Sequence, residues 1–102
     1  MAESPRNTLQ LSVTKKASQQ WRDILLYYTE RNRSDRYSNK LDKELQTMFV
    51  MICNDPRRGK SIKRKGMRRC VIAKRFAVFY RFDLECVEII SIVDARRHVP
   101  LD

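Results

Sequence analysis

Two neighbouring segments of this chain space their apolar residues three or four positions apart, as on one face of an α-helix. In the first segment these residues are Ala17, Trp21, Ile24, Leu25 and Tyr28. In the second segment they are Tyr37, Leu41, Leu45, Met48 and Ile52. Only a short polar stretch separates the two segments, so the helices are expected to fold back on each other as a hairpin.

The ends of both helices are marked by capping residues. Thr14 can cap the first helix, which we expect to begin at Lys15. Ser34 and Asp35 can cap the second. The segment Asn54-Asp55-Pro56 should end the second helix, because the residue before a proline avoids helical backbone angles.

Four further segments have the composition or alternation of β-strands, at residues 8–13, 68–74, 76–82 and 86–94. The breaks at Lys74-Arg75 and Asp83-Leu84-Glu85 have hairpin length, so the last three strands should be antiparallel neighbours. The last strand is apolar on both faces, which suits a central strand between the helices and the floor of a cleft. The order β-α-α-β-β-β predicts an α+β domain, with the helical hairpin packed on a small, mainly antiparallel four-stranded sheet.

The length of 102 residues suits one compact domain. We expect residues 1–7 to form a flexible tail and residues 8–102 to form the domain. The three cysteines, Cys53, Cys70 and Cys86, lie in apolar surroundings without metal-ligand spacing, so we expect reduced core residues, no metal and no cofactor. No signal peptide or membrane span is visible, which predicts a cytoplasmic protein with no membrane partner.

The charge is strongly positive, at +10, and it is unevenly distributed. Between Pro56 and Phe82 there are eleven basic residues and no acid: Arg57, Arg58, Lys60, Lys63, Arg64, Lys65, Arg68, Arg69, Lys74, Arg75 and Arg81. Such a surface suits a polyanionic partner, and we expect these residues to bind nucleic acid. The alternative is a solvated face that protects a sheet edge from aggregation.

Arg81 falls in the middle of a predicted strand, on the face opposite Phe76, Val78 and Tyr80. A cation on a sheet face needs a partner. Either a substrate phosphate or a carboxylate of the neighbouring strand, Glu88 or Asp94, can be that partner.

An ordered set of motifs carries a family resemblance from about Leu9 to Val99. The set comprises Trp21 with Ile24, Leu25 and Tyr28; Asn54-Asp55-Pro56 followed by Gly59-Lys60; Gly66-Met67-Arg68-Arg69; Ala77-Val78-Phe79-Tyr80-Arg81; and Ile89 to Asp94 followed by Ala95-Arg96-Arg97. The chain resembles toxins of the RelE/ParE superfamily, which belong to type II toxin–antitoxin systems. The resemblance implies a cognate antitoxin whose C-terminal segment covers the basic cleft, and we expect that segment to be acidic and amphipathic.

The family includes two kinds of activity. RelE-like members cut mRNA on the ribosome, and ParE-like members poison DNA gyrase without nuclease activity. Carried over to this chain, the sheet arginine of the nucleases matches Arg68 or Arg69, and the arginine near the end of the last strand matches Arg96 or Arg97. The nuclease hypothesis assigns Arg69, Arg81 and Arg96 as cations and His98 as general acid or base. Arg97, beside Arg96, is expected to bind nucleic acid.

Two departures from the nuclease pattern stand against that carry-over. Members with a C-terminal histidine follow it with a tyrosine, whereas His98 is followed by Val99. The loop after the second helix also lacks the expected glutamate. Our first hypothesis is a ribosome-dependent mRNA endonuclease. The alternatives are a non-enzymatic gyrase inhibitor and an inactive binding member of a toxin–antitoxin complex.

Overall fold

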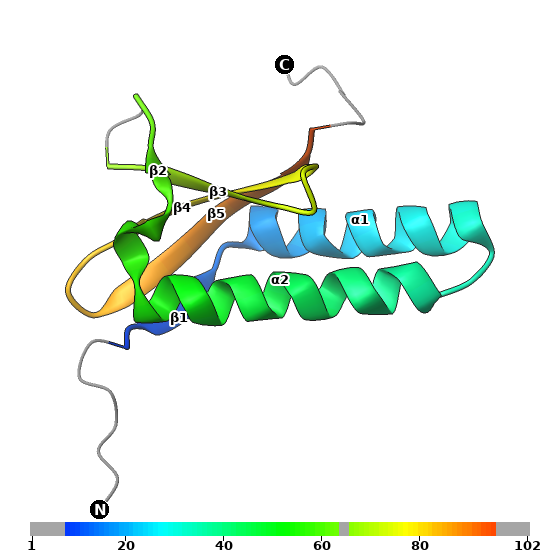
Figure 1. Ribbon diagram of the computed structural model, residues 1–102, viewed down its shortest axis with the longest axis horizontal. Coiled ribbons are helices and arrows are strands. Elements are labelled where there is room, and N and C mark those ends of the chain that lie inside the picture. Colours follow the sequence, from blue (N-terminus) through cyan, green and yellow to red (C-terminus); the bar gives the residue numbers. More distant parts are fainter. Residues whose placement is uncertain (1–7, 64–65, 96–102) are drawn as a thin grey trace, which may run out of the picture.

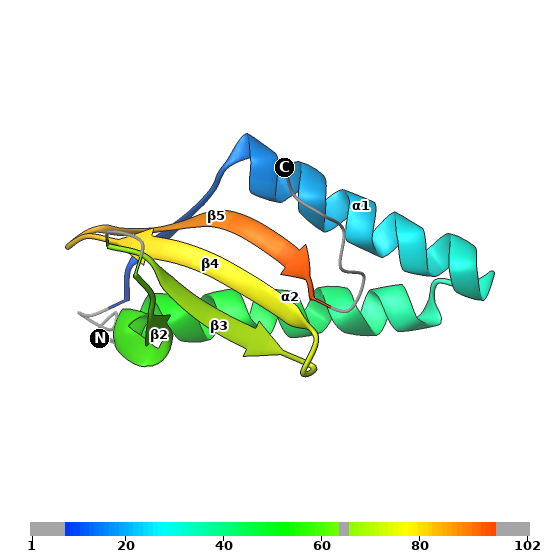
Figure 2. The same cartoon turned by 90° about the horizontal axis from the view of Figure 1, so that it is seen from above.

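Two helices cover one face of a five-stranded sheet (Figure 1). The computed structural model describes residues 8–63 and 66–95, so the predicted tail at 1–7 lies outside the described residues. Helices α1 (Lys15–Asn32) and α2 (Arg36–Asn54) run side by side and extend past one end of the sheet (Figures 1 and 2). The predicted helical hairpin is therefore confirmed, and it leaves the other face of the sheet free of helices.

Of the predicted N-terminal caps, Thr14 acts as expected on the first helix, and Ser34 bonds to the first residue of the second. The Thr14 side chain accepts a hydrogen bond from the Ala17 amide at 3.0 Å, which caps α1. Arg33 ends this helix in the left-handed region, with φ of 53°. The Ser34 hydroxyl accepts from the Arg36 amide at 3.1 Å at the start of α2, whereas Asp35 makes no capping hydrogen bond through its side chain.

The sheet has the strand order β1-β5-β4-β3-β2. Its strands are β1 (Gln10–Val13), β2 (Lys60–Ser61), β3 (Arg68–Ile72), β4 (Phe76–Phe82) and β5 (Cys86–Asp94). Strand β1 is parallel to β5, and the other pairs are antiparallel, as expected for the last three strands. The expected four strands were one too few, because β2 has only two residues and lies inside the basic loop, after the short helix η1 (Pro56–Arg58).

A bulge in β5 explains why this strand is apolar on both faces. Phe79 pairs with Ser91, but the next residue of β4, Tyr80, pairs with Ile89, so Ile90 is the extra residue. One extra residue reverses the faces of all residues beyond it. As a result Ile89 and Ile92 both face the helices, while Val93 faces the open side.

The hairpin between β3 and β4 turns one residue earlier than expected. Its central residues are Ala73 and Lys74, and the Arg75 amide donates to the Ile72 carbonyl at 3.0 Å. Both central residues have positive φ, 52° and 56°, as in a type I′ turn. The turn contains no glycine or asparagine to signal this conformation, so the predicted strand at 68–74 was two residues too long.

The core lies between the helices and the sheet. Its largest fully buried side chains include Tyr80, Phe49, Phe76, Leu41 and Leu45. The three cysteines are free thiols, as predicted: Cys53 and Cys70 are buried and Cys86 is partly exposed. Burial raises the pKa of Cys53 and of Cys70, which keeps both thiols neutral.

Side chains of the α1 cap and of α1 itself form hydrogen bonds with main-chain groups of β5 where its pairing with β1 ends. The Thr14 hydroxyl donates to the Ile90 carbonyl at 3.2 Å, and the Gln20 side-chain oxygen accepts from the Ile92 amide at 2.8 Å. These bonds fix the helical layer against the central strand. No helix in the described part of the chain has the length and apolar character needed to cross a membrane.

Candidate functional site

The face of the sheet that lacks helices carries the candidate site. One row of paired residues crosses four strands at this face: Lys60 on β2 pairs with Arg69 on β3, Arg69 with Phe79 on β4, and Phe79 with Ser91 on β5. Lys60 and Arg69 are exposed, and Phe79 and Ser91 are partly buried. We call this side of the sheet, with Lys60, Arg69, Phe79 and Arg81 as its defining residues, the open face.

Lys60 and Arg69 are cross-strand neighbours of like charge. Like charges directly opposite each other destabilise a sheet, whereas opposite charges would stabilise it. No ion pair to either side chain is formed within the described residues. The pair concentrates positive charge at one edge of the open face, which suits an anionic partner.

The structure gives Arg81 a carboxylate partner. Its Nε atom lies 2.9 Å from Oε1 of Glu88, directly across the β4–β5 ladder. Of the two acids expected as candidates, Asp94 is thus the wrong one, because the β5 bulge turns it toward the helices. The pair is well exposed, at 61% for the Arg81 side chain and 36% for Glu88, so it contributes little stability and Arg81 stays accessible.

An apolar groove of about 270 Å³ lies beside this row of charges. Phe79, Ile90 and Val93 line it from the sheet, Met67 and Ile62 from the loop, and Lys16 from α1. The sequence predicted a cleft at this side of the last strand, and the groove confirms it. A partner can therefore bury apolar groups here while its acidic groups meet the neighbouring cations.

Arg68 does not belong to the open face, although it is adjacent to Arg69 in sequence. Its Nη1 atom donates to the carbonyl oxygens of Gly59 at 2.6 Å and Arg57 at 3.2 Å. Strand alternation places it on the same side as the buried Cys70 and Ile72. Arg68 thus fixes the turn before β2, whereas the Arg69 side chain is exposed on the open face.

Tyr80 also holds this turn in place, from the core of the protein. It is fully buried, and its hydroxyl donates to the Pro56 carbonyl at 2.6 Å and accepts from the Gly59 amide at 2.9 Å. A Cβ atom at Gly59 would lie 2.5 Å from that hydroxyl oxygen, so only glycine fits there. Burial is the main cause that raises the pKa of Tyr80 to about 12. We call Tyr80, Gly59 and Arg68 the turn latch.

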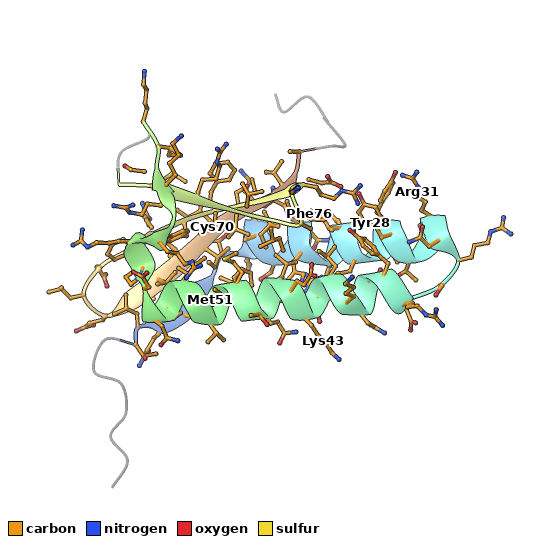
Figure 3. The ribbon with its side chains drawn as sticks, in the orientation of Figure 1. Tyr28, Arg31, Lys43, Met51, Cys70 and Phe76 are labelled. Carbon is orange, nitrogen blue, oxygen red and sulfur yellow. The ribbon has the colours of Figure 1, made fainter. Side chains whose placement is uncertain are left out.

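Arg75 is likewise engaged within the protein. Its guanidinium lies 5.5 Å from the ring centre of Tyr28 and 5.7 Å from that of Phe76, and Nη1 donates to the Tyr37 hydroxyl at 3.1 Å. Figure 3 shows Tyr28 and Phe76 together near the end of the sheet. Arg75, predicted from the sequence to bind nucleic acid, is partly buried as part of this aromatic cluster.

The same cluster contains a buried acid. Tyr28 donates to Oδ2 of Asp94 at 2.5 Å. Burial is the largest cause that raises the pKa of Tyr28 to about 12, and the hydrogen bond to Asp94 adds to it. This buried hydrogen bond joins the end of β5 to α1.

The remaining predicted residues fall into two groups. Arg57, Arg58, Lys63 and Lys74 are exposed, with Arg57 5.8 Å above the Phe82 ring and Lys74 in the β3–β4 turn. Outside the described residues lie Arg64, Lys65, Arg96, Arg97 and His98. The described residues contain no group of three or more His, Cys, Asp or Glu side chains that could hold a metal ion.

A two-helix layer on one face of a small mixed sheet, with exposed cations beside an apolar groove on the other, defines a small basic protein of the α+β class. The family model described as the ParE toxin of the type II toxin–antitoxin system parDE matches residues 11–99. The chain belongs to this toxin family, which confirms the resemblance to RelE/ParE toxins. It is the toxin component of a type II toxin–antitoxin system, and its partner is a cognate antitoxin.

Solved structures share the fold. A chain of the chromosomal ParDE toxin–antitoxin system from P. aeruginosa has a TM-score of 0.72 at 14% identity, covering 86% of this chain and 97% of that one. The conserved hypothetical protein HP0894 from Helicobacter pylori has a TM-score of 0.56 at 19% identity, covering 86% and 96%. No curated protein sequence matches the chain.

Proposed function

We propose that this toxin acts in the cytoplasm by binding DNA gyrase and does not cut RNA. Membership of the ParE family supports this target, because ParE-like toxins poison gyrase. The proposal reverses the order of our two leading hypotheses from the sequence. The reason is the chemistry available on the open face.

RNA cleavage through the 2′-hydroxyl needs a proton acceptor and a proton donor beside the scissile phosphate. Among the described strand residues of the open face, the one acid is Glu88, and it is bound to Arg81. The hydroxyl of Tyr80 is buried and its two hydrogen bonds go to the main chain of Pro56 and Gly59. This sequestered tyrosine, together with the cationic and apolar open face, is the observation that carries the proposal of a binding toxin.

One observation favours the mRNA endonuclease as the second candidate. Lys60 and Arg69 lie side by side and could stabilise the charge that develops on a phosphate. In that mechanism His98 would supply the acid or base, so the two candidates differ in what they require of His98.

Expression of the toxin alone in a bacterium distinguishes the candidates. We expect growth arrest with filamentation and induced DNA repair, while primer extension finds an abundant mRNA intact. His98→Ala should keep this activity. Lys60→Glu with Arg69→Glu should weaken it by about tenfold or more, since reversed charges repel an acidic partner.

The opposite pattern would contradict the proposal. New mRNA ends inside translated codons, lost on His98→Ala, would establish the ribosome-dependent endonuclease. Normal growth with folded protein present would identify an inactive binding member.

A further inference from the structure

The bulge in β5 shapes the apolar groove on the open face. Three residues of β5 line this groove: Ile90, Ser91 and Val93. In a regular strand only alternate residues share a face, so Ile90 and Ser91 would lie on opposite sides of the sheet. The extra residue of the bulge brings both of them to the open face, while Ile89 and Ile92 stay buried under the helices. The groove in this form therefore depends on the bulge.

The outer edge of β5 at the bulge is covered by a helix. Among the described strands, β1 pairs with this edge only as far as Val13 and Ile89. Beyond that point α1 lies beside β5, and its side chains bond to the strand (Figure 2). The Gln20 side-chain oxygen accepts from the Ile92 amide at 2.8 Å and from the Ser91 hydroxyl at 3.2 Å. Gln20 thus holds the strand on the C-terminal side of the bulge.

Thr14 holds the N-terminal side of the same bulge. Its amide donates to the Ile89 carbonyl at 3.1 Å, and its hydroxyl donates to the Ile90 carbonyl at 3.2 Å. The same hydroxyl caps α1 by accepting from the Ala17 amide, so any change at Thr14 also disturbs the helix. Both hydrogen bonds of the Gln20 side chain, in contrast, go to β5. Gln20 can therefore be changed without removing the cap of α1.

We propose that Gln20 is a positioning residue for target binding, which holds the β5 bulge so that Ile90 and Val93 form one wall of a groove for an apolar side chain of the target. Met67 lines the groove from the loop, and the exposed Lys16 adds a cation. An apolar side chain beside a carboxylate is the group that this arrangement fits. The inference rests on the proposed function, in which the open face binds gyrase.

The test compares three variants of the full-length toxin: Gln20→Leu, Gln20→Glu and Gln19→Leu. Gln20→Leu keeps the approximate size of the side chain but removes the acceptor, so the affinity for purified gyrase should fall by about fivefold or more. Gln20→Glu keeps an oxygen acceptor for both donors and should bind within about twofold of the unmodified toxin. Gln19→Leu is the matched control and should bind normally, because Gln19 is exposed and bonds to Asp23 on the same helix.

A double-mutant cycle separates positioning from a general loss of stability. Val93→Ala removes apolar surface from the groove itself. If Gln20 acts through the groove, Gln20→Leu combined with Val93→Ala should lose clearly less gyrase affinity than the product of the two single losses. All variants are compared at a temperature where circular dichroism shows each of them fully folded, so a lower stability alone does not change the measured affinity.

NMR spectra of the toxin alone test the same inference without gyrase. Gln20→Leu should shift the methyl signals of Ile90 and Val93, because the wall that they form is no longer held in place. It should also speed hydrogen exchange of the Ile92 amide, which loses its acceptor. Gln19→Leu should leave all three signals unchanged.

Three results would overturn the inference. One is a Gln20→Leu toxin whose Ile90 and Val93 methyl signals and Ile92 exchange match those of the unmodified protein. Another is gyrase affinity that Gln20→Leu does not reduce. The third is a pair of losses that multiply in the cycle with Val93→Ala, which would mean that Gln20 acts elsewhere. A toxin that does not bind gyrase at all would contradict the proposed function, and the NMR spectra would still decide whether Gln20 shapes the groove.

Discussion

Tyr80 is the residue on which the geometry of the basic turn most depends. Its hydroxyl is bonded to both Pro56 and Gly59, in a place that water does not reach. Tyr80→Phe removes both bonds and leaves the buried Gly59 amide and the partly buried Pro56 carbonyl without this partner. We expect the free energy of unfolding to fall by about 1–3 kcal/mol, measured by urea denaturation.

The control for this prediction is Tyr37→Phe. The Tyr37 hydroxyl accepts from Arg75, whose guanidinium is only half-buried. Its removal should cost less than about 1 kcal/mol, because Arg75 can bind water instead. Equal losses for the two variants would show that the turn latch has no special role.

The two buried tyrosines should also make the stability of the folded protein sensitive to alkaline pH. The pKa of Tyr28 and that of Tyr80 are each raised to about 12, above the value of about 10 in an unfolded chain. Folding therefore favours the neutral phenols, so this contribution to stability is fully present below about pH 10 and is lost as the pH rises through about 12. Unfolding measured from about pH 9 to about pH 12 should show a smaller loss for Tyr28→Phe and Tyr80→Phe than for the unmodified protein. Identical pH profiles would contradict this account.

The alternation of side chains along β3 is enough to distinguish the roles of Arg68 and Arg69. Arg68 has the same parity as Cys70 and Ile72, which are core residues, whereas Arg69 has the parity of the exposed Val71. The sequence contained this signal. The acceptors of Arg68 could not be predicted, because they are carbonyls of a turn whose path depends on the latch.

At the scale of elements, the β3–β4 turn has a backbone conformation that its residues do not favour. Ala73 and Lys74 both adopt positive φ, where side chains crowd the backbone. Ala73→Asn with Lys74→Gly supplies the residues that a type I′ turn prefers. We expect the free energy of unfolding to rise by about 1 kcal/mol or more, measured by urea denaturation. A loss of stability would mean that the turn is not of this type.

The helices could be predicted closely because their information is local. Thr14, the apolar spacing and Pro56 lie within the segments that they define. The bulge at Ile90 could not be predicted, because it depends on how β5 pairs with β4. Strand β2 has only two residues and so shows no alternation, and the β3–β4 turn contains no glycine or asparagine to mark its position. The fold class was still correct, since the extra strand, the bulge and the early turn leave a helical hairpin packed on one face of a small, mainly antiparallel sheet.

At the scale of the whole molecule, the two faces of the sheet have different roles. The helical face holds the core, and the open face holds Lys60, Arg69 and Arg81 around an apolar groove. The concentration of positive charge in this half was evident from the sequence. Its division between presented cations and the internally engaged Arg68 and Arg75 required the three-dimensional arrangement.

The most direct test of the proposed function is a supercoiling and cleavage assay with purified DNA gyrase and purified toxin. The account predicts that the toxin inhibits supercoiling or traps cleaved DNA, that antitoxin reverses the effect, and that Lys60→Glu with Arg69→Glu weakens it by about tenfold or more. Gyrase that remains fully active, beside mRNA cut by the same preparation on translating ribosomes, would contradict the account.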